Sequence, residues 1–152
     1  MLENNEPNIN ENSTKEIYNL LERASTTEEL DKIISNLPKT SFVVRIDELR
    51  EKYELTFSQI QINSGITKSL FYAIVSGTRK SKKNHIIKIG VAMGISLEEM
   101  NELLKLAQHK ELYAKNKEDA IIIFGLKNKL KIIEIEELLS DYGATLHLLE
   151  KE

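Results

Sequence analysis

Four cations lie within five residues near the middle of the chain, in the stretch Arg79-Lys80-Ser81-Lys82-Lys83. Lysine and arginine side chains at this density bind phosphate groups, and the counterions that they displace make such binding dependent on salt. A charge run taken alone is more often a solvated loop. The chemistry of this stretch therefore depends on the elements that position it.

The sequence contains few residues in the patterns that catalysis or metal binding requires. The chain has no cysteine, which excludes thiol catalysis, disulfides and thiolate zinc sites. Its three histidines lack the spacing of metal ligands and suit exposed or capping positions: His85, His109 and His147. Neither a glycine-rich phosphate loop nor a nucleophile elbow occurs. We expect no enzyme activity, no catalytic residue, no metal and no cofactor.

Adjacent acids are a further candidate for acid/base catalysis. Neighbours in a helix diverge around its axis, so adjacent pairs are more typical of solvated faces than of acid/base couples. Such pairs include Glu98-Glu99, Glu118-Asp119 and Glu136-Glu137.

The first element that positions the cations is a short predicted helix upstream of them. Thr56 can cap this helix, and we expect its apolar residues Phe57, Ile60 and Ile62 to face inward. Gly65 can adopt the positive φ that ends a helix.

A second short helix is predicted immediately afterwards. Thr67 is its N-cap candidate, and Leu70, Phe71 and Ile74 recur at helical spacing before Gly77 ends it. Two short helices that meet across a tight glycine turn have helix-turn-helix geometry, in which the first helix braces the second against the major groove of DNA.

From about Phe42 to Leu104 the chain resembles, without a gap, the phage-repressor helix-turn-helix family (Cro and lambda-repressor-like, xenobiotic-response-element type). Four landmarks carry the resemblance: the first helix at 46–56, the turn Gly65-Ile66-Thr67, the exit Gly77-Thr78-Arg79, and Met93-Gly94-Ile95-Ser96-Leu97-Glu98 before a fifth helix. The resemblance implies an all-α, five-helix domain in a bacterial or phage regulator that binds double-stranded DNA, as a homodimer on a twofold site.

The resemblance also assigns roles to individual residues. It makes 68–76 the recognition helix, with Lys68, Ser69, Tyr72 and Ala73 toward base edges and the loop 79–83 on the phosphates. Lys68 can donate to guanine O6 or N7, and Tyr72 can stack on a thymine methyl or reach a phosphate. The expected DNA-binding residues are Thr67, Lys68, Ser69, Tyr72, Ala73, Thr78, Arg79, Lys80, Lys82 and Lys83.

Three positions depart from the family pattern. Phe57 stands where a glutamine often contacts phosphate, and Ala73 stands where many relatives carry a long polar side chain. Val75 replaces a glutamate that usually pairs with a basic residue at the position of Arg50, so Arg50 must find another acceptor or turn to solvent. These departures favour an alternative in which the chain is a protein-interaction module, such as an antitoxin or an adaptor.

The resemblance leaves both ends of the chain outside the five-helix domain. We expect a disordered tail at 1–12, an N-terminal helix pair at 13–38, the helix-turn-helix domain at 40–108 and a C-terminal helical hairpin at 116–149. Capping boxes are predicted at Ser13-Thr14-Lys15-Glu16 and Ser96-Leu97-Glu98-Glu99. Pro38 is expected to stop the second helix of the N-terminal pair.

The C-terminal hairpin contains the apolar run Ile121-Ile122-Ile123-Phe124, which needs a cover. The cover is the core domain, the N-terminal pair or a second subunit, and we favour a role in packing or dimerisation over a site for an effector or a protein partner.

Charge is distributed unevenly along the chain. The net charge is −3, but residues 40–96 hold nine basic and four acidic residues, a balance of +5. The positive charge thus lies on the segment expected to face DNA. The polar, acidic start and the absence of a long apolar run favour a cytoplasmic protein without membrane contact.

Overall fold

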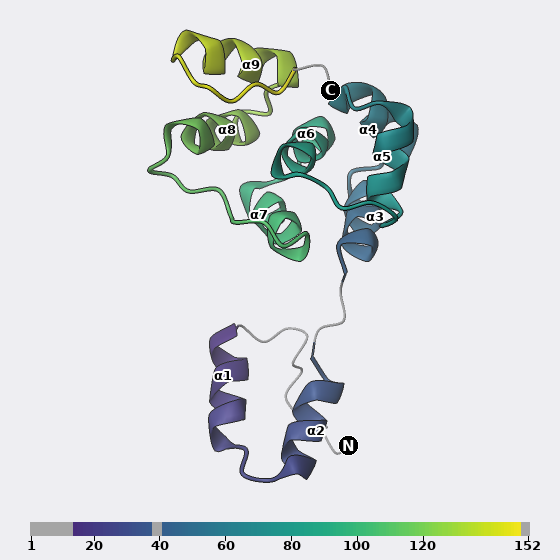
Figure 1. Ribbon diagram of the computed structural model, residues 1–152, viewed down its shortest axis with the longest axis vertical. Helices are drawn as coiled ribbons and strands as arrows, with labels where there is room; N and C mark the ends of the chain where they lie inside the picture. The colour runs from purple at the N-terminus through teal and green to yellow at the C-terminus, as the bar shows by residue number, and fades with distance from the viewer. Residues whose placement is uncertain (1–13, 38–40, 150–152) are drawn as a thin grey trace. The chain divides into compact units, whose positions relative to one another are not determined.

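The computed structural model describes residues 14–37 and 41–149 (Figure 1). The chain divides into two units, Met1–Thr40 and Ser41–Glu152. All regular structure in the described residues is helical, which confirms the all-α prediction. The helices are α1 (Thr14–Arg23), α2 (Thr27–Ser35), α3 (Phe42–Lys52), α4 (Phe57–Ser64), α5 (Lys68–Val75), α6 (Lys83–Met93), α7 (Leu97–Leu106), α8 (Lys117–Lys127) and α9 (Ile132–Asp141).

The first unit contains the two short helices α1 and α2. Thr26 caps α2, since its hydroxyl accepts a hydrogen bond from the backbone N–H of Glu29 at 3.1 Å. Ile33 is buried, while large apolar side chains on both helices remain exposed: Tyr18, Leu21, Leu30 and Ile34. The predicted tail at 1–12, the Ser13 cap and the Pro38 stop lie outside the described residues.

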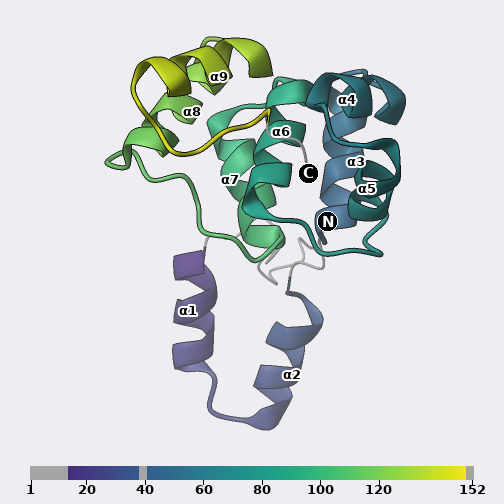
Figure 2. The same ribbon diagram turned by 45° about the horizontal axis from the view of Figure 1, so that its top comes forward.

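The second unit is built around α6, which packs against α4, α7 and α9 (Figure 2). Most of its residues are buried, including Ile86, Ile87 and Ile89 at 1% exposure or less. Gly90 lets α7 approach closely, because a Cβ at this position would lie 2.3 Å from the terminal methyl of Met100. The isoleucine-rich sequence of α6 therefore forms the centre of the core.

Glu99 joins α7 to α3. Its side chain closes the capping box predicted with Ser96, since it accepts the Ser96 backbone N–H at 2.9 Å. The same carboxylate accepts hydrogen bonds from Lys52 and from the Tyr53 hydroxyl. Burial alone raises the pKa of Glu99, but the bonds from Lys52, Ser96 and Tyr53 outweigh burial and lower it to about 2. Burial and the Glu99 carboxylate together raise the pKa of Tyr53 to about 12.

The hairpin of α8 and α9 packs on the same core, with α8 against α7 and α9 against α6. Its inner face buries Ile122, Leu126, Ile135 and Leu139. The segment after α9 folds back over the hairpin, where Glu136 accepts the backbone N–H of Leu148 at 2.6 Å. The core domain thus covers the inner face, which was one of the three expected covers.

Several side chains lie differently from the sequence expectations. Ile62 was expected to face inward but is 69% exposed, since it lies two residues from the buried Ile60 and thus on the opposite side of α4. Glu99, expected on a solvated face, is 7% exposed. Lys88, one of the nine basic residues counted in 40–96, is only 6% exposed.

Candidate nucleic-acid interface

The helices α4 and α5 are joined by the three-residue turn that the sequence predicts. Thr56 and Gln59 form a capping box at the start of α4, and Gly65 ends the helix at a φ of +72°. The turn is held by two side chains of α4. Gln61 donates to the Ile66 carbonyl at 2.7 Å, and Ser64 accepts the Ile66 backbone N–H at 3.2 Å. These bonds fix the direction in which α5 leaves α4.

The inner face of α5 anchors the helix in the core. Leu70, Phe71 and Ile74 are buried, as the sequence predicts, and so is Val75. The outer face presents Lys68, Ser69 and Tyr72, the last 37% exposed. The Tyr72 ring meets the Phe71 ring edge-on, with 5.3 Å between centroids. Tyr72 thus presents a fixed ring and a hydroxyl at the surface.

Three further residues expected to contact DNA lie at the two ends of α5 or within it: Thr67, Ala73 and Thr78. Thr67 is exposed at the N-cap, but its hydroxyl makes no capping hydrogen bond. Ala73 is half-buried, and its carbonyl accepts hydrogen bonds from the Thr78 backbone N–H at 3.0 Å, the Arg79 N–H at 3.2 Å and the Thr78 hydroxyl at 3.2 Å. Thr78 therefore ties the cationic loop to the end of α5.

Gly77 brings this loop close to α3. Its φ is +80°, and a Cβ at this position would lie 2.8 Å from a methyl of Val43. Only glycine combines this conformation with this approach.

Two groups of cations in the second unit differ in their pairing. Those of α3 bind carboxylates: Arg45 lies 2.7 Å from Glu102, Arg50 lies 2.8 Å from Asp47, and Lys52 binds Glu99. Arg50 also donates to the Leu55 carbonyl and lies over the Phe57 ring, so it does find another acceptor, as expected.

Most cations of α5 and the loop have no such partners. Within the described residues, no ion pair forms at Lys68, Arg79, Lys80 or Lys82, and all four are exposed. No aspartate or glutamate occurs anywhere in 55–97. We call these four residues the unpaired cations.

Helix dipoles add to this positive charge. Both α5 and α6 begin with a lysine, Lys68 and Lys83, and neither has an acid in its first turn. A cation at a helix N-terminus is unfavourable for the isolated helix, whereas it favours a bound anion. Each of the two N-termini is thus suited to a bound phosphate, and that of α6 lies at the end of the loop 79–83.

The far end of the loop is held by the connector between α7 and α8 and by the start of α8. His109 Nε2 lies 2.8 Å from the Ser81 carbonyl, and Lys83 lies 3.9 Å from Asp119. Asp119 also accepts the Tyr113 backbone N–H at 2.8 Å. Lys83 is therefore partly covered, unlike the unpaired cations. Sequence reasoning missed His109 and Asp119, since nothing local to either residue signals a contact with the loop.

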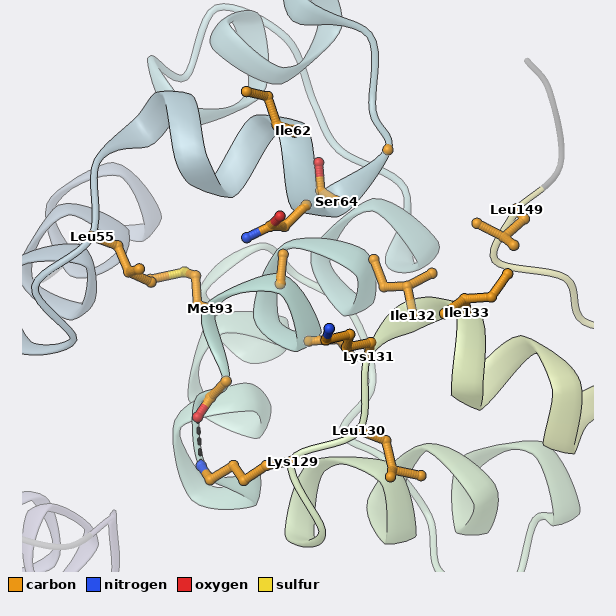
Figure 3. A pocket seen from close by; sticks show the side chains of 15 residues that line it. Leu55, Ile62, Ser64, Met93, Lys129, Leu130, Lys131, Ile132, Ile133 and Leu149 are labelled. Atoms are coloured by element: carbon orange, nitrogen blue, oxygen red, sulfur yellow. Dashed lines mark hydrogen bonds between the residues drawn. The ribbon is translucent and has the colours of Figure 1, made fainter.

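A separate hollow of about 700 Å³ lies on another part of this unit, between α4, the end of α6 and the start of α9 (Figure 3). Exposed apolar side chains line it at Ile62, Ile133 and Leu149. The charged residues in its lining are Lys129 and Lys131, and Lys129 reaches the Gly94 carbonyl. The hollow thus combines apolar side chains with two lysines and with the polar residues Asn63 and Ser64.

Metal ligands do not gather in the described part of the chain, where no group of three or more histidine, cysteine or acidic side chains is placed to hold an ion. His85 acts as a capping residue, since its Nδ1 accepts the Lys82 backbone N–H at 3.2 Å. None of the helices within 14–37 and 41–149 has the length and apolar character needed to cross a bilayer.

Comparison with protein-family models, with curated proteins and with solved structures finds no match to this chain. Its function must be inferred from its own residues and their arrangement.

Proposed function

We propose that the chain is a sequence-specific DNA-binding transcriptional regulator with a lambda-repressor-like helix-turn-helix domain formed by α3 to α7. In this proposal α5 enters the major groove, and the loop 79–83 binds the flanking phosphates. The observation that carries the proposal is the pairing difference: cations on α3 are neutralised by carboxylates, whereas the unpaired cations Lys68, Arg79, Lys80 and Lys82 on α5 and its loop are exposed.

Each part of the surface has a distinct role in binding. Lys68 and Tyr72 supply a donor and a ring toward base edges, where a lysine recognises guanine O6 or N7. Arg79, Lys80 and Lys82 bind phosphates, which positions α5 and adds affinity without sequence preference. Thr78, which bonds to Ala73, maintains the spacing between these two functions.

The test is the salt dependence of binding to a duplex selected from a random pool. Changing Lys80→Gln and Lys82→Gln together should weaken binding to all duplexes alike and lower the slope of log K against log salt by about 2. The matched control is Lys110→Gln with Lys115→Gln, two exposed lysines of the α7–α8 connector. A slope that the first pair leaves unchanged removes the loop from the interface.

A separate change tests base readout. Lys68→Ala should alter the preferred sequence at one position of the selected duplex, at about 1 kcal/mol of discrimination. Equal weakening on all duplexes would instead make Lys68 a phosphate contact.

A second candidate function is the protein-interaction module, and the hollow between α4, α6 and α9 favours it. Its exposed Ile62, Ile133 and Leu149 beside Lys131 suit an apolar segment with acidic flanks. Electrophoretic shift of the purified chain on DNA from its own promoter region, beside light scattering, separates the two functions. Specific retention supports the regulator, whereas no retention together with co-purification of another protein supports the module.

A further inference from the structure

The outer face of the α8–α9 hairpin carries a second, smaller hollow of about 250 Å³. It is lined by Ala120, Ile121, Phe124, Leu138 and Tyr142, none of which is charged. Phe124 is 54% exposed and Tyr142 is 63% exposed, although the opposite face of the same hairpin is packed on the core. Large aromatic side chains beside an apolar depression form a surface that water covers poorly.

Charged residues border this outer face with opposite signs on its two helices. On α8, Lys117 and Lys127 lie seven and three residues from Phe124, so the helical repeat places them on its face. On α9, Glu134 and Asp141 lie four and three residues from Leu138 and border it likewise. All four are exposed. The outer face is therefore neutral at its centre, basic along α8 and acidic along α9.

If the outer faces of two copies meet, the relative direction of α8 and α9 determines which charged residues lie opposite each other. Lys117, at the start of α8, donates to the carbonyl of Tyr142, at the end of α9, at 2.9 Å. The helices are thus antiparallel, and the start of α8 lies beside the end of α9. A twofold axis between the helices and parallel to them would lay α8 of each copy over α9 of the other.

We propose that the outer face of the α8–α9 hairpin binds a second copy of this chain in that arrangement, as a four-helix bundle. Lys117 then lies opposite the partner's Asp141, and Lys127 lies opposite the partner's Glu134. Phe124 of each copy packs against the partner's hollow. An axis across the helices would set α8 over α8 and bring lysines together, so the charge pattern selects the first arrangement.

The surface suits a copy of itself better than another class of partner. An interface between identical surfaces must be self-complementary, and a face with one basic and one acidic border meets that condition where a face of one sign does not. The inference deepens the proposed function and rests on it for its role, because a regulator on a twofold DNA site needs two recognition helices about 34 Å apart.

The first test measures the mass of the full chain by sedimentation velocity over a range of concentrations, without DNA. We expect a reversible dimer. Phe124→Asp should weaken it at least a hundredfold, because it places a charge in the apolar centre. Ile62→Asp, an exposed apolar residue of α4, is the matched control and should leave the dimer unchanged. Circular dichroism checks that both variants keep their helices.

The second test distinguishes the two axes by charge exchange. Lys117→Glu and Asp141→Lys should each weaken the homodimer, since each sets like charges together. Mixing the two variants should restore a heterodimer, because both of its contacts then join opposite charges. A chain that stays monomeric, a dimer that Phe124→Asp leaves intact, or variants that do not prefer each other would overturn the inference.

Failure of this inference is distinguishable from failure of the proposed function. A dimeric chain that binds no duplex keeps the α8–α9 interface and rejects the DNA-binding function. A monomeric chain that binds a single half-site with Lys80-dependent and Lys82-dependent affinity keeps the DNA-binding function and rejects the interface.

Discussion

The helices α3 and α5 both carry cations, but they use them differently. On α3, Arg45, Arg50 and Lys52 bind carboxylates and join the helix to α7 or to its own turns. On α5 and its loop the unpaired cations contact no acid, and Lys68 lies at a helix start where a cation is unfavourable. Pairing therefore separates charge that stabilises the fold from charge that is free for a ligand.

The comparison predicts that changes around α3 alter stability and leave DNA binding intact. The largest effect is expected for Glu99→Gln, which removes the carboxylate that binds Lys52 and Tyr53. A lowering of the Glu99 pKa from 4.5 to about 2 corresponds to about 3 kcal/mol of unfolding free energy at neutral pH. Denaturant titration measures this loss, and Glu98→Gln, an exposed neighbour, is the control.

Glu99 also makes the unfolding free energy depend on pH. Because the pKa of Glu99 is lower in the folded chain than in the unfolded chain, its contribution is complete above about pH 4.5 and is lost as the pH falls toward 2. Glu99→Gln should flatten this acid limb of the stability curve. An acid limb identical to that of the unchanged chain would show that Glu99 does not carry the α3–α7 junction.

The next largest effect on stability is expected at Gly77, where the loop after α5 approaches α3. Gly77→Ala forces a Cβ into a φ of +80° and to within 2.8 Å of Val43 on α3, and should reduce the unfolding free energy by about 2 kcal/mol. Gly65→Ala has a similar φ but open space around the Cβ, and should cost about 1 kcal/mol. Thermal unfolding of both variants compares them. Equal losses would mean that the approach of the loop to α3 is unimportant.

A smaller effect separates the two groups of cations directly. Arg79→Gln should weaken DNA binding by about fivefold while leaving stability unchanged, since it removes one charged phosphate contact. Arg45→Gln should do the reverse, reducing the unfolding free energy by about 0.5 kcal/mol without a change in DNA affinity. Fluorescence anisotropy at constant salt measures the affinity. DNA binding that depends on Arg45 as strongly as on Arg79 would break the comparison.

The smallest effect concerns the support of the loop. His109→Ala removes the contact to the Ser81 carbonyl and should weaken DNA binding by about twofold, because the loop loses one of its anchors. Since His109 is itself not in the proposed interface, the slope of affinity against salt should stay as in the unchanged chain. A lower slope would place His109 on the phosphates instead.

Local patterns in the sequence predict much of the second unit. The Thr56 cap, the Ser96 capping box, the left-handed Gly65 and the buried face of α5 all depend on residues a few positions apart. The prediction for Ile62 was wrong because Ile60 and Ile62 lie on opposite sides of a helix, so both cannot face the core.

Long-range contacts were beyond the reach of such patterns. The bonds of Glu99 to Lys52 and Tyr53 join residues 47 and 46 positions apart, and the contact of His109 with Ser81 spans 28. Counting charges also could not separate α3 from α5, because a count treats a paired arginine and an unpaired one alike. The buried Lys88 shows the same weakness, since it is one of the nine basic residues counted in 40–96.

Lysine reactivity, measured by acetylation and mass spectrometry with and without a bound duplex, tests the central claim most directly. This experiment compares the unpaired lysines with the paired Lys52 in a protein that carries no substitution. We predict that DNA protects Lys68, Lys80 and Lys82 and leaves Lys52, Lys110 and Lys115 as reactive as before. Protection of Lys52 or of the connector lysines, with Lys68, Lys80 and Lys82 unchanged, would contradict the account.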